Sequence, residues 1–217
     1  CKNINPYLVD ARDTIITRRS NPICDVSKMS FGNMPLDGGN LIINDEDLNE
    51  FISKEPKAKK YILPLISARE FLNRKNRWCL WLESIEPKDL KSMPFVLERV
   101  KAVKAFRMAS KAPSTQKHAA TPTLFRDRNR PNTFIVVPRV SSENRKYIPM
   151  GFFGYESIVS DTCMSIPNGT LYNFGVLMSE MHMAWVKYTC GRLKSDFRYS
   201  KDLVYNNYPW PKEVSNK

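Results

Sequence analysis

The chain has 217 residues, of which 42% are hydrophobic and 26% are charged, and its formal net charge is +12. This length and composition predict one large packed domain, or one domain with an appendage, and exclude disorder for most of the chain. No apolar run approaches the roughly 18 residues of a membrane span, and the first residues lack a signal-peptide core, so we expect no membrane partner. Because the chain begins with Cys1 and not with methionine, we expect a piece of a longer protein.

The cysteines and histidines argue against a disulfide scaffold and a zinc site. The five cysteines are widely spread and form no Cys-x-x-Cys pair, which indicates a reducing, cytoplasmic setting. The two histidines, His118 and His182, lie far apart in sequence, so we predict no metal ligands. We expect His182, which lies in an apolar helical pattern, to be a core or interface residue.

Positive charge is concentrated in one part of the sequence. Between Arg99 and Lys146 there are twelve basic residues and only two acidic ones, Asp127 and Glu143, so these 48 residues carry a net charge of +10. Such a stretch is typical of proteins that bind polyanions. The alternative is a solvated surface that only keeps the protein in solution. Residues 45–55 are acidic, and we expect them to lie away from any phosphate backbone.

The N-terminal part is rich in proline and glycine, which predicts loops with short strands at 14–17 and 41–43. Residues 46–52 predict a short helix, with Asn44 or Asp45 as its N-cap.

The next two predicted elements are a strand and a helix. The short, aromatic, apolar run at 77–82 is typical of a buried strand. Residues 94–111 predict a helix that has Ser92 as its N-cap and Pro94 in its first turn. At 100° per residue, Val96, Val100 and Val103 share one face of this helix. Four cations fall within an arc of about 120° beside that face; they are Lys101, Lys104, Arg107 and Lys111.

The second half of the sequence alternates loops with regular elements. Residues 112–130 are polar and interrupted by proline, which predicts a loop, and residues 133–140 predict a strand that is an edge strand or ends at Pro138. The apolar repeat at 170–190 is the clearest helix, with Gly191 as its C-cap.

The motifs of a complete enzyme are missing. The glycines form neither a Gly-x-Gly-x-x-Gly motif nor a phosphate-binding loop, and no serine lies in a nucleophile-elbow pattern. Asn5-Pro6-Tyr7 lacks the second proline of the amino-methyltransferase site Asn/Asp-Pro-Pro-Tyr/Phe, so we interpret it as a turn. We therefore predict no catalytic, cofactor-binding or metal-binding residue in this chain.

Seven motifs, in this order, are shared with a known family. They are Asn3-Ile4-Asn5-Pro6-Tyr7-Leu8-Val9-Asp10, Gly32-Asn33-Met34-Pro35-x-Asp37-Gly38-Gly39, Arg77-Trp78-Cys79-Leu80-Trp81, Ser141-Ser142-Glu143-x-Arg145-x-Tyr147-Ile148-Pro149, Met181-His182-x-Ala184-Trp185, Gly191-Arg192-Leu193-x-Ser195-Asp196-x-Arg198-Tyr199-Ser200 and Val204-Tyr205-Asn206-Asn207-Tyr208-Pro209-Trp210-Pro211. Together they resemble the C-terminal half of MmeI-like, type IIL restriction–modification enzymes, over nearly the whole chain.

The resemblance implies an α+β fold. We expect a mixed α/β target recognition domain with short twisted sheets over residues 1–167, followed by a helical C-terminal region over residues 168–217; the alternative is one continuous fold. It also implies a bacterial parent enzyme that methylates adenine N6 with S-adenosylmethionine and cuts DNA with Mg²⁺. This fragment would bind neither cofactor, and its partners would be double-stranded DNA and the methyltransferase domain of the same chain.

One specificity segment can be placed by position. Family members carry a Phe-x-Glu-x-Arg-x-Pro-like segment whose two variable residues help to read a base pair, and here the sequence is Phe125-Arg126-Asp127-Arg128-Asn129-Arg130-Pro131. Asp127 and Asn129 occupy the variable places. A carboxylate can accept from cytosine N4, and an asparagine can bind adenine through two hydrogen bonds. The alternative for Asp127 is an internal salt bridge with a neighbouring arginine.

Arg126, Arg128 and Arg130 can each hold phosphate or read guanine. The other candidate contacts are to the DNA backbone. The complete predicted DNA-binding set is Lys101, Lys104, Arg107, Ser110, Lys111, Arg126, Asp127, Arg128, Asn129, Arg130, Ser141, Ser142 and Arg145.

Two other functions compete with this reading. A non-specific RNA- or single-stranded-DNA-binding protein would use the same basic stretch at 99–146, but it would interleave aromatic residues for stacking. The aromatic residues in and just after that stretch are only Phe106, Phe125, Phe134 and Tyr147. A structural adaptor would leave the net charge of +10 unexplained. The sequence therefore favours double-stranded DNA.

Overall fold

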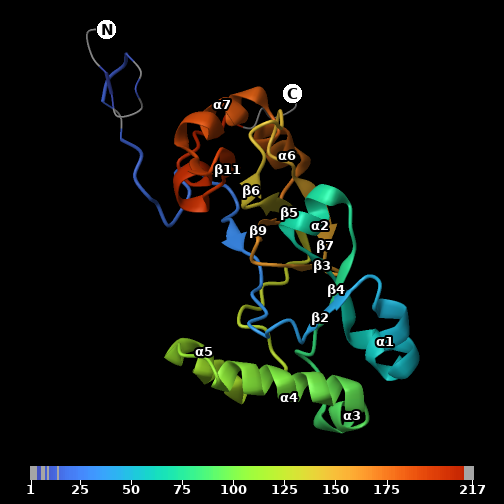
Figure 1. The fold of residues 1–217 in the computed structure, drawn as a ribbon. Coiled ribbons are helices and arrows are strands. Elements are labelled where there is room, and N and C mark those ends of the chain that lie inside the picture. Colours follow the sequence, from blue (N-terminus) through green and yellow to red (C-terminus); the bar gives the residue numbers. More distant parts are fainter. Residues whose placement is uncertain (1–3, 6–7, 9, 14, 213–217) are drawn as a thin grey trace. The chain divides into compact units, whose positions relative to one another are not determined.

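The computed structural model describes residues 4–5, 8, 10–13 and 15–212. The chain divides into two compact units whose segments alternate along the sequence (Figure 1). Unit 1 comprises Cys1–Ser30, Thr133–Phe152 and Met164–Lys217, and unit 2 comprises Phe31–Asn132 and Phe153–Cys163.

Unit 2 is built on a four-stranded sheet with the order β2-β4-β3-β8. Strand β4 pairs antiparallel with β2 and β3, and β3 pairs parallel with β8, with Leu65 opposite Ile158. The elements of this unit are β2 (Ile42–Asn44), α1 (Leu48–Lys54), the 3-10 helix η1 (Pro56–Tyr61), β3 (Ile62–Ile66), α2 (Ala68–Asn73), β4 (Arg77–Leu80), α3 (Pro87–Lys91), α4 (Pro94–Met108), α5 (Pro113–Lys117), the 3-10 helix η2 (His118–Ala120) and β8 (Ile158–Val159).

Helix α4 supplies much of the core of unit 2. Val96, Val100 and Val103 are buried, as the helical period predicts, and they belong to one hydrophobic cluster with Leu80 and Leu82. Burying such side chains is the main stabilising contribution available to a unit of this size.

Unit 1 contains the other sheets. A four-stranded sheet has the order β1-β9-β5-β7, and a three-stranded sheet has the order β10-β11-β6. The elements are β1 (Ser30–Phe31), β5 (Thr133–Pro138), β6 (Val140–Ser141), β7 (Gly151–Gly154), β9 (Cys163–Pro167), α6 (Leu171–Leu177), α7 (Glu180–Thr189), β10 (Gly191–Leu193), β11 (Asp196–Arg198) and the π-helix η3 (Lys201–Tyr205). Strands β1, β7 and β9 each include one or two residues of the segments assigned to unit 2.

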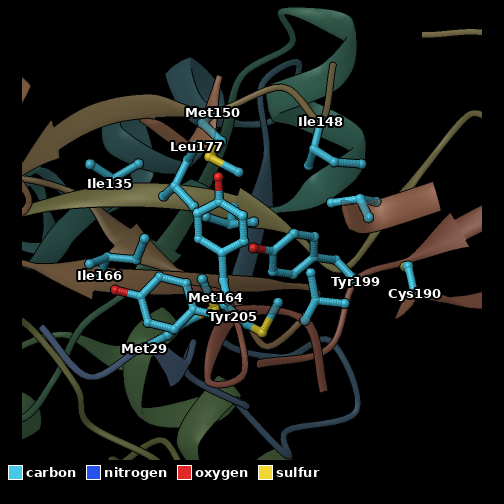
Figure 2. Packing of buried hydrophobic residues seen from close by; sticks show 14 of the residues in the cluster. Met29, Ile135, Ile148, Met150, Met164, Ile166, Leu177, Cys190, Tyr199 and Tyr205 are labelled. Carbon is cyan, nitrogen blue, oxygen red and sulfur yellow. The ribbon is translucent and has the colours of Figure 1, made fainter. Parts of the chain in front are cut away.

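The core of unit 1 draws on segments far apart in the sequence. Figure 2 shows Met29, Ile135, Met164, Tyr199 and Tyr205 among the residues of this cluster. This cluster includes residues on both sides of the predicted domain boundary after residue 167. The division into domains at 1–167 and 168–217 remains a prediction.

The predicted mixture of helices and short sheets is confirmed, but the C-terminal part is less helical than expected. The predicted helix at 170–190 is two helices, α6 and α7, because Ser179 accepts from His182 N and so caps a new helix. Gly191 begins strand β10 and is not a C-cap, and β10, β11 and η3 follow.

Several boundaries also differ in the first half. The predicted helix at 46–52 is α1, which begins and ends two residues later. Of the predicted strand at 14–17, residues 15–17 have no regular structure, and Thr14 lies outside the described residues. Helix α4 has Met93 as its N-cap, because Ser92 ends the preceding helix α3. Its end at Met108 leaves Lys111 beyond the helix.

The predicted loop and strand at 112–140 need smaller corrections. The predicted loop at 112–130 contains α5 and η2, since Pro113 starts a short helical turn. The predicted strand at 133–140 is interrupted at Arg139, and β5 ends at Pro138 in the interior of its sheet. No helix of the described residues is long and apolar enough to cross a bilayer.

Candidate nucleic-acid interface

The exposed face of α4 presents part of the predicted cation set. Lys101 and Lys104 lie on the helix and are exposed, and Lys111 is exposed just after it. None of the three forms a salt bridge with any described residue. Ser110, half-buried beside Lys111, accepts from the backbone N–H of Ala112 through its hydroxyl. These ammonium groups are therefore available to a phosphate backbone.

Arg107 corrects the predicted set of DNA contacts, because its side chain is fully buried. It lies four residues after Val103, on the continuation of the buried valine face. Its five N–H groups donate to five backbone carbonyls; these belong to Pro35, Leu36, His118, Thr121 and Leu124, at 2.7–2.9 Å. Burial lowers the pKa of this guanidinium, and the carboxylate of Asp37 opposes that shift. Arg107 is thus a structural residue in this unit.

We call Phe125–Pro131 the arginine segment. Phe125 is buried at its start, and the polar residues that follow are exposed or half-buried. The segment has no helix or strand, so its conformation depends on bonds to other parts of unit 2. Arg126 N donates to Met34 O at 2.9 Å, and the side chain of Asn33 bonds to the backbone of Asn129.

The three arginines of the segment each have a partner within unit 2. Arg126 donates twice to Oδ2 of Asp127, at 2.7 and 3.0 Å, which is the internal salt bridge weighed above. Arg128 Nε lies 3.1 Å from Glu83, and Arg130 stacks over the ring of Tyr155 at 3.6 Å. Exposed ion pairs of this kind contribute only about 0–1 kcal/mol, so a phosphate can replace the protein partner.

Asp127 keeps hydrogen-bonding capacity in this pairing. Both bonds from Arg126 go to Oδ2, and no described residue donates to Oδ1. The Asp127 side chain is 42% exposed. A carboxylate oxygen in this position can accept from an exocyclic amine such as cytosine N4.

The other predicted contacts lie in unit 1. Ser141 in β6 is only 2% exposed, and its hydroxyl has no partner among the described residues, so burial removes it from the predicted phosphate contacts. Ser142 and Arg145 follow β6 in a turn, in which Arg145 N donates to Ser142 O. Ser142 is half-buried and Arg145 exposed, so both remain candidates.

The structure therefore brings together α4 and the arginine segment in unit 2, and places Ser141, Ser142 and Arg145 in unit 1. Two residues of unit 2 that matter to the site were missed as such by sequence reasoning. In the sequence, Asn33 stands out only as part of a family motif, and the charge of Arg107 predicts a surface position. Both make bonds to residues distant in sequence, which spacing does not reveal.

The family model described as MmeI, target recognition domain, matches residues 10–212. The chain belongs to the MmeI target recognition domain family. The match to the family model extends across the predicted domain boundary after residue 167.

Two longer relatives of this MmeI-type domain are closely similar. The curated protein "DNA methyltransferase A" of Bacillus subtilis (strain 168) is 44% identical over 216 residues, which is 99% of this chain and 24% of that protein. A solved structure of the type IIL restriction–modification enzyme MmeI in complex with DNA matches with a TM-score of 0.95 and 41% identity, over 99% of this chain and 29% of that one. The chain thus spans about a quarter of the length of these relatives.

Proposed function

We propose that this chain is the sequence-specific, double-stranded DNA recognition module of a longer, bifunctional adenine-N6 methyltransferase and restriction endonuclease. One observation carries the proposal: the chain matches, over 99% of its length and at a TM-score of 0.95, part of an enzyme whose structure was solved with DNA.

The chemistry of unit 2 supports a division of labour within the module. Lys101, Lys104 and Lys111 offer cations without a described partner, and such contacts set affinity and register. Asp127 and Asn129 are short polar residues in an irregular segment, and such groups read base edges. The positive charges hold the duplex and the acid and amide discriminate between bases.

The parent chain supplies the chemistry in this proposal. Its methyltransferase domain, the module's partner in the same polypeptide, uses S-adenosylmethionine, and its endonuclease uses Mg²⁺. The module itself binds neither and catalyses nothing, since its sequence has no cofactor loop and no nucleophile–base pair. The four described cysteines are free thiols, which accords with a bacterial cytoplasm.

Binding of the chain to labelled duplex DNA over a range of salt concentrations tests this function. We expect weak binding. The logarithm of the association constant should fall linearly with the logarithm of the salt concentration, and each phosphate contact should add about −0.9 to that slope. A flat salt response would contradict the electrostatic argument. Stronger competition by single-stranded DNA or RNA than by duplex would favour the alternative function.

The absence of cofactor binding has a separate test. Titration of S-adenosylmethionine into the chain in a calorimeter should give no binding heat. Micromolar binding would mean that the module includes part of the methyltransferase domain.

A further inference from the structure

The side chain of Asn33 makes an unusual set of bonds to the arginine segment. Asn33 is fully buried in unit 2. Its Oδ1 accepts from the backbone N–H of Asn129, and its Nδ2 donates to the carbonyl oxygen of Asn129 at 2.9 Å. Nδ2 also donates to Val159 O at 3.0 Å. One side-chain amide therefore satisfies both main-chain groups of Asn129, as a neighbouring strand would.

The residues after Asn33 continue this contact. Met34 O accepts from Arg126 N at 2.9 Å. Pro35 and Leu36 accept from the buried guanidinium of Arg107, which also donates to Leu124 O. The strip 33–36 is thus bonded to residues 124, 126 and 129, directly or through Arg107.

The strip is itself held firmly in unit 2. Asn33 N donates to Val159 O at 2.7 Å, and Asp161 N donates to Asn33 O at 3.1 Å. At Gly32, an added Cβ would lie 2.1 Å from Ser160 O, so only glycine permits this close approach. Residues 33–36 therefore hold the arginine segment in a fixed position relative to strand β8 and its flanking residues.

We propose that Asn33 is a positioning residue for base recognition, which fixes the backbone at Asn129 so that the segment presents Asp127 and Asn129 to the DNA in one geometry. This inference rests on the proposed function. Asn33 is fully buried and so presents no surface to a base. The two bonds from Asn33 hold the main chain of an irregular segment at Asn129, and base discrimination depends on that geometry.

The direct test uses Asn33→Asp in the full-length parent enzyme. Aspartate has nearly the same shape, but it replaces the donor Nδ2 with an oxygen that faces the carbonyls of Asn129 and Val159. Methylation rates are measured on the recognised sequence and on duplexes with each single base-pair change. We expect discrimination at one base pair to fall by about tenfold or more. The salt dependence of binding should stay unchanged, because no phosphate contact is removed.

Asn206→Asp is the matched control. Asn206 is 1% exposed in unit 1, and its Nδ2 donates to Arg19 O at 2.7 Å, so this change also removes a buried amide donor. It should lower stability without altering discrimination between sequences. If both variants changed discrimination equally, Asn33 would be an ordinary core residue and the inference would fail.

A second measurement needs no variant, and so it holds even where Asn33→Asp does not fold. In hydrogen exchange of the wild-type enzyme, the exchange rate of the Asn129 main-chain amide should be lower than the rates of the Asp127 and Arg128 amides by a factor of about ten or more. Equal rates would overturn the inference, as would unchanged discrimination in a folded Asn33→Asp enzyme. A wild-type enzyme with no sequence preference would instead refute the proposed function, and the inference with it.

Discussion

The ring of Phe125 lies edge-on against the indole of Trp81, with ring centroids 5.1 Å apart and an interplanar angle of 60°. Both side chains are buried in the core of unit 2. This contact joins the first residue of the arginine segment to the hydrophobic core. The exposed part of the segment therefore starts from a rigid point.

Removing this anchor should destabilise the protein. We expect Phe125→Ala to lower the free energy of unfolding by about 3–5 kcal/mol, because it deletes a buried ring and leaves a cavity. Chemical denaturation measures this loss. Phe95→Ala is a suitable control, since Phe95 is 44% exposed and its removal should cost far less. Equal losses for the two variants would contradict the assigned role of Phe125.

Changing Asp127 and Asn129 together should alter specificity. In the full-length parent, we expect this double change to shift the preferred base at one position, with about 1–3 kcal/mol of discrimination for each lost contact. Sequencing of methylated DNA reports the preferred site. If the methylated sequence stayed the same, while a change near Arg145 shifted it, the arginine segment would be the wrong choice.

Removing a cation should act differently. Lys104→Ala or Arg128→Ala should weaken binding to every sequence about equally and reduce the salt slope by about 0.9. Binding titrations at several salt concentrations provide both values. Lys57→Ala, an exposed lysine of unit 2 outside the basic stretch, should leave the slope unchanged. A change in base preference in the Lys104 variant would argue against a backbone contact.

Acid should destabilise unit 1 through His182. This residue is fully buried, its Nε2 lies 3.0 Å from the hydroxyl of Tyr199, and burial lowers its pKa to about 4. In the unfolded chain the histidine takes up a proton near pH 6.5, so the unfolded state binds more protons between pH 6.5 and 4. The free energy of unfolding should therefore fall by about 3 kcal/mol as the pH drops through this range.

The substitution His182→Gln tests this pH dependence. Glutamine keeps an N–H group near Tyr199 but does not titrate, so the loss of stability between pH 6.5 and 4 should be smaller than in the wild type. Denaturation curves at several pH values measure it. The same pH dependence in both proteins would mean that other groups cause the acid sensitivity.

Elements with a strong local pattern were predictable from the sequence. The valine face of α4 and the strand at 133–138 follow from periodicity and from β-branched residues, and Pro138 marks the end of the strand. The same periodicity puts Arg107, four residues after Val103, on that face. Its charge pointed to the surface, and only the five carbonyls that converge on its guanidinium explain why it is buried.

The arrangement of the site was not predictable in the same way. Asn33 and Asn129 are separated by 96 residues, and no spacing rule joins them. The cap formed by Ser179 divides a repeat that looks like one helix, because an apolar period continues through the break. The assignment of Phe125–Pro131 came from the family resemblance, and composition alone indicated only a basic stretch.

The alternation of the two units along the chain limits how recognition can be exchanged between enzymes. Unit 2 is not one continuous stretch: strand β8 comes from a second segment and pairs with β3. A graft of residues 31–132 alone would join a foreign β3 to the host's β8 and a foreign Asn33 to the host's Val159. Engineering by recombination therefore needs crossovers on both sides of 153–163 as well, whereas point changes within the arginine segment leave every such junction intact.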